Sequence, residues 1–198
     1  MPKFSDKALR LILDSEGMHY KPEWPGEKSG ITIGIGYDLG YQTVDMFESD
    51  WGNFLTRLQT ERLRAVVGLR EEKARKRVEE LSDIKIRRVD AEEVFIRRSL
   101  PVYFERARQA YPGLDNLPLD AQGAILSLVY NRGTSMFDKP GEDRRKEMRA
   151  IRDAVAEGDL QEIADQLRSM KRLWDANKSA GLLTRREAEA ALVESCIA

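Results

Sequence analysis

The residue best placed to act as an acid is a glutamate at the end of the first apolar stripe. Leu9, Ile12 and Leu13 recur at the spacing of a buried helix face. Glu16 takes the next place on that face, and Gly17 after it is a residue type that commonly ends a helix. Burial disfavours the ionised form of a carboxyl group, so we expect Glu16 to stay protonated near neutral pH and to donate its proton to a leaving group. The alternative is that the helix ends there and Glu16 turns into solvent.

A hydroxyl and a carboxylate flank two glycines on the segment with the clearest strand character, residues 31–39. Four residues of one parity face the same way along such a strand: Thr32, Gly34, Gly36 and Asp38. A floor without side chains lets a flat polar polymer approach, although an ordinary glycine-rich hairpin has the same pattern. A straight strand would hold Thr32 and Asp38 about 20 Å apart. For both to act beside Glu16 the chain must fold back, so we predict a bent or hairpin path at Gly34–Gly36.

Aromatic side chains gather around the same segment, at Tyr20, Trp24, Tyr37 and Tyr41. Aromatic rings with hydroxyl groups suit the alternating apolar and polar faces of sugar rings, and they equally suit the core of a small lobe. We take Tyr20 and Tyr37 as candidate substrate contacts.

Composition narrows the class of protein. The chain has 198 residues, with 33 Lys+Arg against 34 Asp+Glu, and this balance gives no case for a nucleic-acid binder. Cys196 is the single cysteine and His19 the single histidine, which excludes an intrachain disulfide and a zinc site. No cofactor is implied, and we expect a monomer.

The chain shows no targeting or membrane segment by composition. Its start, MPKFSDK, lacks an apolar core and a cleavage-like site, so we expect no signal peptide. No apolar stretch approaches the length needed to cross a bilayer. We therefore expect synthesis in the cytoplasm and a separate delivery route to any target beyond the inner membrane.

The pattern along the chain predicts an α+β protein that is mainly α. Ser5 can cap a first helix that runs to about Ser15. Glycine and proline punctuate residues 17–42, which predicts a small β-bearing lobe, and a larger helical lobe follows at 43–198. Helices are predicted near 43–50, 53–67, 70–82, 90–111, 119–131, 142–157, 159–174 and 184–196. Pro101 either kinks the fourth of these or divides it. We expect one domain over residues 1–198.

Three blocks in the same order resemble the phage-type lysozymes. The first is Glu16-Gly17 followed, after a loop, by GITIGIG at 30–36. The second, AILSLVYNRG at 124–133, resembles the central helix of that family with its Asn-x-Gly turn. The third, GLLTRREAE at 181–189, resembles its C-terminal helix. The resemblance implies a lysozyme-like fold and a muramidase that cleaves the glycan strands of peptidoglycan, acting at the cell wall in the periplasm.

The departures from the family pattern concern the second carboxylate. Many phage lysozymes have a histidine after the second glycine and the second carboxylate in the loop before the threonine. Here Tyr37 and Asp38 follow Gly36, and the only acid late in the preceding loop is Glu27. A threonine with an aspartate six residues later looks more like the muramidase domain of the bacteriocin pesticin. The resemblance therefore implies Glu16, Thr32 and Asp38 as the catalytic set, with Glu27 as the reserve.

A glycosidase needs one protonated carboxyl group and one carboxylate. Glu16 is expected to be the acid, and Asp38, in a polar glycine-rich setting, the ionised partner. The hydroxyl of Thr32 can hold the attacking water, which would favour inversion. A carboxyl separation close to 5 Å would indicate a retaining enzyme and a wider gap a water-mediated route.

In the later blocks, Asn131 and either Arg185 or Arg186 are candidates for glycan contacts or for orienting Glu16. Asn131 could contact the substrate, or it could only cap the helix end before Gly133. Arg185 is expected in a first helical turn with Arg186, where a cation opposes the helix dipole and favours a specific partner such as a carboxylate.

Three other functions remain open from the residues alone. A non-catalytic peptidoglycan- or chitin-binding module needs the aromatic residues but not Glu16, Thr32 and Asp38. A lytic transglycosylase uses the same glutamate without a water-activating partner. A helical interaction protein would use the Ile-Gly-Ile-Gly hairpin for structure only. An inhibitor or immunity partner cannot be inferred from the sequence.

Overall fold

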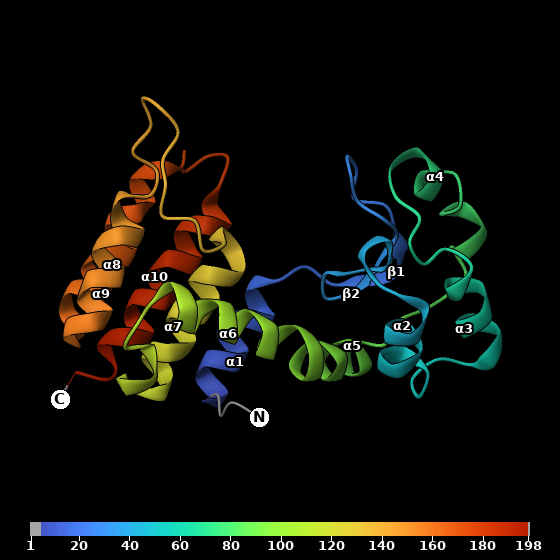
Figure 1. The fold of residues 1–198 in the computed structure, drawn as a ribbon, viewed down its shortest axis with the longest axis horizontal. Helices are drawn as coiled ribbons and strands as arrows, with labels where there is room; N and C mark the ends of the chain where they lie inside the picture. Colours follow the sequence, from blue (N-terminus) through green and yellow to red (C-terminus); the bar gives the residue numbers. More distant parts are fainter. Residues whose placement is uncertain (1–4, 198) are drawn as a thin grey trace. The chain divides into compact units, whose positions relative to one another are not determined.

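The computed structural model describes residues 5–197 and separates into two units, which the chain crosses at Ser15 and at Leu100 (Figure 1). One, the sheet unit, is Glu16–Leu100. The other, the helical unit, contains the described residues up to Ser15 and from Pro101 onward. The sheet-bearing part of the chain therefore extends well past residue 42. The expectation about the leader concerns residues 1–7, of which 1–4 lie outside the described residues.

The sheet has three antiparallel strands in the order β1 (His19–Glu23), β2 (Thr32–Gly34) and β3 (Tyr37–Asp38). The β2–β3 hairpin pairs Thr32 with Asp38 and Ile33 with Tyr37. Gly34 and Gly36 at its turn have φ of 59° and 63°, a left-handed backbone that glycine adopts without a Cβ clash. The bend predicted at these glycines is confirmed. Strand β1 was not predicted, because its sequence HYKPE lacks apolar alternation and contains proline.

The sheet unit also contains the α-helices α2 (Val44–Trp51), α3 (Arg57–Arg64), α4 (Glu71–Arg75) and α5 (Arg88–Val94). The first two begin at threonine caps, and Thr56 forms a capping box with Gln59. Trp51 is buried against the hairpin, since a Cβ added to Gly34 would lie 3.0 Å from its ring. The turn of the hairpin therefore packs directly against the buried Trp51 ring.

The helix predicted at 90–111 is a continuous run of three pieces. After α5 come a π-helical segment, Phe95–Ser99, and α6 (Leu100–Ala110). The amide of Leu100 donates to the carbonyl of Phe95, one residue further back than in an α-helix. Pro101 has no N–H to donate, so the widened turn lies directly before it.

The helical unit contains α1 (Asp6–Ser15), α6, α7 (Leu119–Arg132), α8 (Lys146–Glu157), α9 (Leu160–Ser169) and α10 (Ala180–Glu194). Residues 121–129 of α7 are all buried, α10 packs on α7 and α9, and α9 packs on α8 (Figure 1). Ser5 caps α1 as expected, accepting from the amide of Ala8 at 3.0 Å. Gly123 allows α1 to cross α7 closely, because a Cβ there would lie 2.0 Å from that of Ala8.

Short 3-10 turns complete the structure at Leu39–Tyr41, Glu79–Leu81, Leu114–Asn116 and Met170–Leu173. The mainly helical composition with one small sheet near the N-terminus confirms the predicted fold class. Within residues 5–197 we find no helix with the length and apolar character required to cross a membrane.

Candidate active site

The hairpin brings Thr32 and Asp38 together. They are direct cross-strand partners, whose Cα atoms lie about 5 Å apart in an antiparallel pair. The amide of Leu39 donates to the carbonyl of Ile31 at 2.9 Å and fixes the register beside them. Thr32 is buried and Asp38 is half-buried. Opposed residues of a pair project from one face of the sheet, so a hydroxyl and a carboxylate share that face.

The carboxylate of Asp38 is held by backbone amides. Gly30 N–H donates to both of its oxygens, at 3.0 and 3.1 Å, and Gly40 N–H donates to Oδ1 at 2.8 Å. A Cβ on Gly30 would lie 2.5 Å from Oδ1 and 2.4 Å from the nitrogen of Gly40, so only glycine fits there. Asp38 thus ties the entry of β2 to the exit of β3. The sequence pattern did not reveal this role.

Glu16 directly follows the last residue of α1 and is half-buried. The buried line of α1 runs through Ala8 and Ile12, at a spacing of four that Glu16 continues, while Leu9 and Leu13 are only half-buried. The position on the stripe is therefore as expected, with partial burial of the carboxyl group. Its role as the acid stays a prediction.

Glu27, the reserve carboxylate, lies in a loop that is held by several hydrogen bonds. It is exposed and has φ of 47°, a left-handed conformation that is uncommon for a residue with a Cβ. The turn is closed by Ser29 N–H donating to Gly26 at 3.1 Å. The carbonyl of Ser29 accepts from Trp24 Nε1 at 3.1 Å and from the amide of Glu71 at 2.8 Å. These bonds fix the loop around an outward-facing carboxylate.

The aromatic residues divide into exposed and buried ones. Tyr20 and Tyr41 are 55% and 58% exposed, and Arg70 lies over the Tyr41 ring. Tyr37 is buried, and its hydroxyl donates to Asp50 Oδ2 at 2.9 Å. Burial and the neighbouring Asp50 carboxylate raise the pKa of Tyr37 above its usual range. Tyr37 therefore has a packing role, and substrate contact by Tyr20 or Tyr37 stays a prediction.

In the helical unit, Asn131 is exposed in the last turn of α7. The helix ends at Gly133, which has φ of 71° and whose amide donates to Val129 at 2.8 Å. Gly133 therefore supplies the C-cap residue of this helix, and the alternative in which Asn131 only caps the helix end stays a prediction. Contact of Asn131 with substrate stays a prediction.

Arg185 is buried, and its placement in a first helical turn was wrong. Helix α10 begins at Ala180, and the hydroxyl of Thr184 donates back to the carbonyl of Ala180 within it. Arg185 donates to the hydroxyl and carbonyl of Ser127, at 3.0 and 2.9 Å, and to Glu189 Oε1 at 3.3 Å. The expected carboxylate partner thus includes one on the same helix, and contact with glycan stays a prediction.

Glu189 is the centre of this buried charge cluster, which the sequence pattern did not reveal. Its Oε1 accepts from Ser127 at 2.6 Å and from Arg186 at 2.7 Å, and both Glu189 and Arg186 are fully buried. Burial raises the pKa of Glu189 and lowers that of Arg186. The only available signal was a run of charged residues on a helix whose neighbouring positions are apolar.

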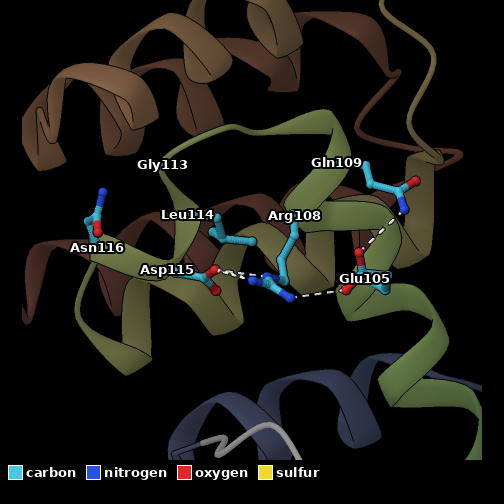
Figure 2. A pocket seen from close by; sticks show the side chains of 7 residues that line it. All are labelled: Glu105, Arg108, Gln109, Gly113, Leu114, Asp115 and Asn116. Carbon is cyan, nitrogen blue, oxygen red and sulfur yellow. Dashed lines mark hydrogen bonds and ion pairs between the residues drawn. The ribbon is translucent and has the colours of Figure 1, made fainter.

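A surface hollow of about 380 Å³ on the helical unit lies at the end of α6 (Figure 2). Its charged side chains satisfy one another: Arg108 pairs with Asp115 at 2.6 Å and with Glu105 at 3.1 Å. Gln109 donates to Glu105 at 3.3 Å. None of the predicted site residues lines this hollow. Elsewhere too, the described part of the chain holds no group of three or more histidine, cysteine or acidic side chains suited to a metal ion.

Comparison with solved structures relates the fold of this chain to a known one. The crystal structure of the active form of the P1 phage endolysin Lyz matches with a TM-score of 0.56 and 16% sequence identity, covering 98% of this chain and 86% of that one. The fold is lysozyme-like. The prediction drawn from the three sequence blocks is confirmed at the level of fold.

Sequence comparison adds one match. A family model described as a domain of unknown function, DUF8812, matches residues 14–104. That span nearly coincides with the sheet unit and contains Glu16, Thr32 and Asp38. No curated protein matches the chain.

Proposed function

We propose that this protein is a peptidoglycan glycoside hydrolase, an N-acetylmuramidase, in which Glu16 is the general acid. The observation that carries the proposal is the pairing of Thr32 with Asp38 across a glycine-turned hairpin, in a chain whose fold resembles that of a phage endolysin. Glu16 begins the same unit and is half-buried. The substrate is the glycan strand of the cell wall, and the protein acts there as a monomer.

The chemistry assigns one task to each group. Glu16 transfers its proton to the glycosidic oxygen as the bond to the sugar carbon breaks, so the leaving sugar departs as an alcohol. A carboxylate opposite stabilises the positive charge that develops on the sugar ring. The hydroxyl of Thr32 holds the water that attacks the carbon, and the carboxylate accepts the proton that this water loses, which favours inversion.

Asp38 and Glu27 are the two candidates for the carboxylate. Asp38 is the direct partner of Thr32, which supports the assignment. Glu27 is exposed in a loop closed by hydrogen bonds at Ser29, and the structure shows no hydrogen bond or ion pair of its carboxylate among the described residues. We retain Asp38 as the first candidate and Glu27 as the reserve.

The decisive experiment is digestion of purified cell walls followed by mass spectrometry of the products. We expect hydrolysis products from the wild-type protein and a loss of about 10²–10⁴-fold in rate for Glu16→Gln, because general acid catalysis contributes that much. Glu79→Gln is the matched control, since Glu79 is an exposed glutamate of the same unit. Retained cleavage by a folded Glu16→Gln variant would refute the assignment.

The same assay separates the alternatives. A lytic transglycosylase would release anhydro-sugar products that are one water lighter than hydrolysis products. A non-catalytic binding module would sediment with the walls without reducing their turbidity. The hydrolase is favoured over both because Thr32 and Asp38 lie together on one face.

A further inference from the structure

Three arginines of the helical unit lie together without carboxylate partners. Arg132 is the last residue of α7, and Arg144 and Arg145 precede α8; we call these three residues the arginine corner. Arg132 Nη2 donates to the carbonyl of Arg144 at 2.7 Å, and Arg145 Nη1 donates to the carbonyl of Arg132 at 3.0 Å. Within the described residues, none of the three forms an ion pair. Arg145 Nη1 also donates to Met148 Sδ at 3.0 Å, so two backbone carbonyls and one thioether sulfur hold these two guanidinium groups.

The acidic residues around the arginine corner are already paired with other cations. Asp138 pairs with Arg149 at 2.9 Å. Asp143 pairs with Arg172 at 3.1 Å, and Glu147 pairs with the same arginine. Glu147 still acts electrostatically on Arg132, and Asp138 on Arg145, whose amide donates to Asp138 Oδ1 at 2.7 Å. No guanidinium group of the arginine corner, however, is ion-paired with a carboxylate among the described residues, whereas most other arginines there are.

Burial makes this charge costly. Desolvation, together with the cations Arg145, Arg144 and Arg186, lowers the pKa of Arg132 to about 10. An anion placed between these groups would offset both the desolvation of Arg132 and its repulsion by the neighbouring cations. It supplies the opposite charge and accepts the hydrogen bonds that water would otherwise accept.

Further buried donors surround the same place. The guanidinium carbon of Arg132 lies 5.2 Å from the centroid of the Trp174 ring, and that of Arg186 lies 6.0 Å from the same centroid. The Nε atoms of Arg132 and Arg186 and the hydroxyl of Tyr111 are buried without a hydrogen-bond partner in the described structure. Arg145 and Arg132 are the charges that act most strongly on Tyr111. Fully buried polar groups of this kind call for a partner.

We propose that the arginine corner binds a small oxyanion, a phosphate or carboxylate group, through Arg132 and Arg145. The planar guanidinium fork matches two oxygens of such a group, and two forks held by backbone carbonyls are oriented before the ligand arrives. Trp174 covers Arg132 on one side and limits its motion. This site does not depend on the proposed hydrolase activity.

The test is a titration of the full-length protein with inorganic phosphate at constant ionic strength, followed by the arginine Nε–Hε signals in NMR spectra. We expect a saturable shift of the Arg132 signal, identified by its absence in Arg132→Gln. Arg132→Gln and Arg145→Gln should each weaken binding about tenfold or more, because each removes charge-assisted hydrogen bonds. Arg106→Gln is the matched control, since Arg106 also lies over an aromatic ring, that of Tyr103 at 5.0 Å, and is exposed without an ion pair.

Parallel titrations with methyl phosphate and with acetate identify the source of the oxyanion, and saturation by either supports the site. A shift of the wild-type signal that rises linearly without saturation would overturn the proposal, whether or not the variants fold. Equal affinities in wild type, Arg132→Gln and Arg145→Gln would do the same. A loss of binding in Arg106→Gln equal to that in Arg145→Gln would reduce the effect to general surface charge and also overturn it.

Discussion

Replacing Asp38 by asparagine tests whether one carboxylate joins the two ends of the β2–β3 hairpin. The change leaves one oxygen acceptor and places an amide N–H₂ group where Gly30 N–H now donates. Gly30 N–H therefore keeps only one of its two acceptor oxygens and faces the new N–H₂ group, and the Gly30 and Gly40 donors both lose the charge of their acceptor. Hydrogen bonds to charged groups contribute about 1.5–3 kcal/mol each, so we expect Asp38→Asn to lower the free energy of unfolding by about 2–4 kcal/mol.

The effect should be local as well as global. For a chain of this length, that loss corresponds to a fall in melting temperature of about 5–15 °C. Hydrogen exchange should show faster exchange of the amides of Gly30 and Gly40, since these are the two donors. Asp45→Asn is the control, because Asp45 is an exposed aspartate in the first turn of α2 and its loss should cost about 0.5 kcal/mol. Unchanged protection of Gly30 and Gly40 in Asp38→Asn would refute the reasoning.

Three further changes test other parts of the structure. Gly30→Ala places a Cβ 2.5 Å from the Asp38 carboxylate and should unfold the hairpin, seen as lost dispersion of the strand amides in NMR spectra; a native spectrum would contradict the close approach. Tyr37 and Tyr111 have pKa values raised by burial, so the unfolded chain loses these protons first and stability should fall as pH rises above about 10, as denaturant titrations at several pH values can measure. A free energy of unfolding that stays constant up to pH 11 would contradict this prediction. Glu189→Ala leaves Arg186 fully buried without the Glu189 carboxylate and should cost about 3–5 kcal/mol in chemical denaturation, whereas a loss below 1 kcal/mol would mean that the cluster is solvated.

Local signals predicted the elements well, and distant partners account for what was missed. The helix around α7 was predicted from its apolar run, and the hairpin from glycines that had to reverse the chain. Strand β1 was missed because its pairing with β2, not its own pattern, makes it a strand. Helix α10 begins four residues before the predicted start, since its N-cap, Ser179, makes no side-chain capping bond that a sequence motif could reveal.

In the candidate site, too, the features set by local sequence were predicted, and those that depend on distant residues were missed. Sequence parity placed Thr32 and Asp38 on one face, and the observed register agrees. The amides that donate hydrogen bonds to the Asp38 carboxylate belong to Gly30 and Gly40. Their approach to Asp38 depends on the closed hairpin and on the packing of residues 69–70 against Gly40. A glycine in the sequence does not reveal what would occupy the place of its Cβ.

The bonds of Asp38 also bear on how the proposed reaction divides its tasks. A carboxylate has about four lone-pair positions, and three hydrogen bonds to backbone amides leave about one for a water molecule. A carboxylate held in this way can stabilise a sugar cation, yet it is poorly placed to orient a nucleophile as well. Orientation of water then falls to Thr32, or to Glu27 if its loop faces the substrate. We therefore expect Thr32→Val to reduce turnover more than substrate binding while stability is kept, and Glu27→Gln, at an exposed position, to leave stability unchanged. Wild-type turnover by Glu27→Gln would leave Asp38 as the second carboxylate, whereas its loss with an intact fold would transfer that role to Glu27.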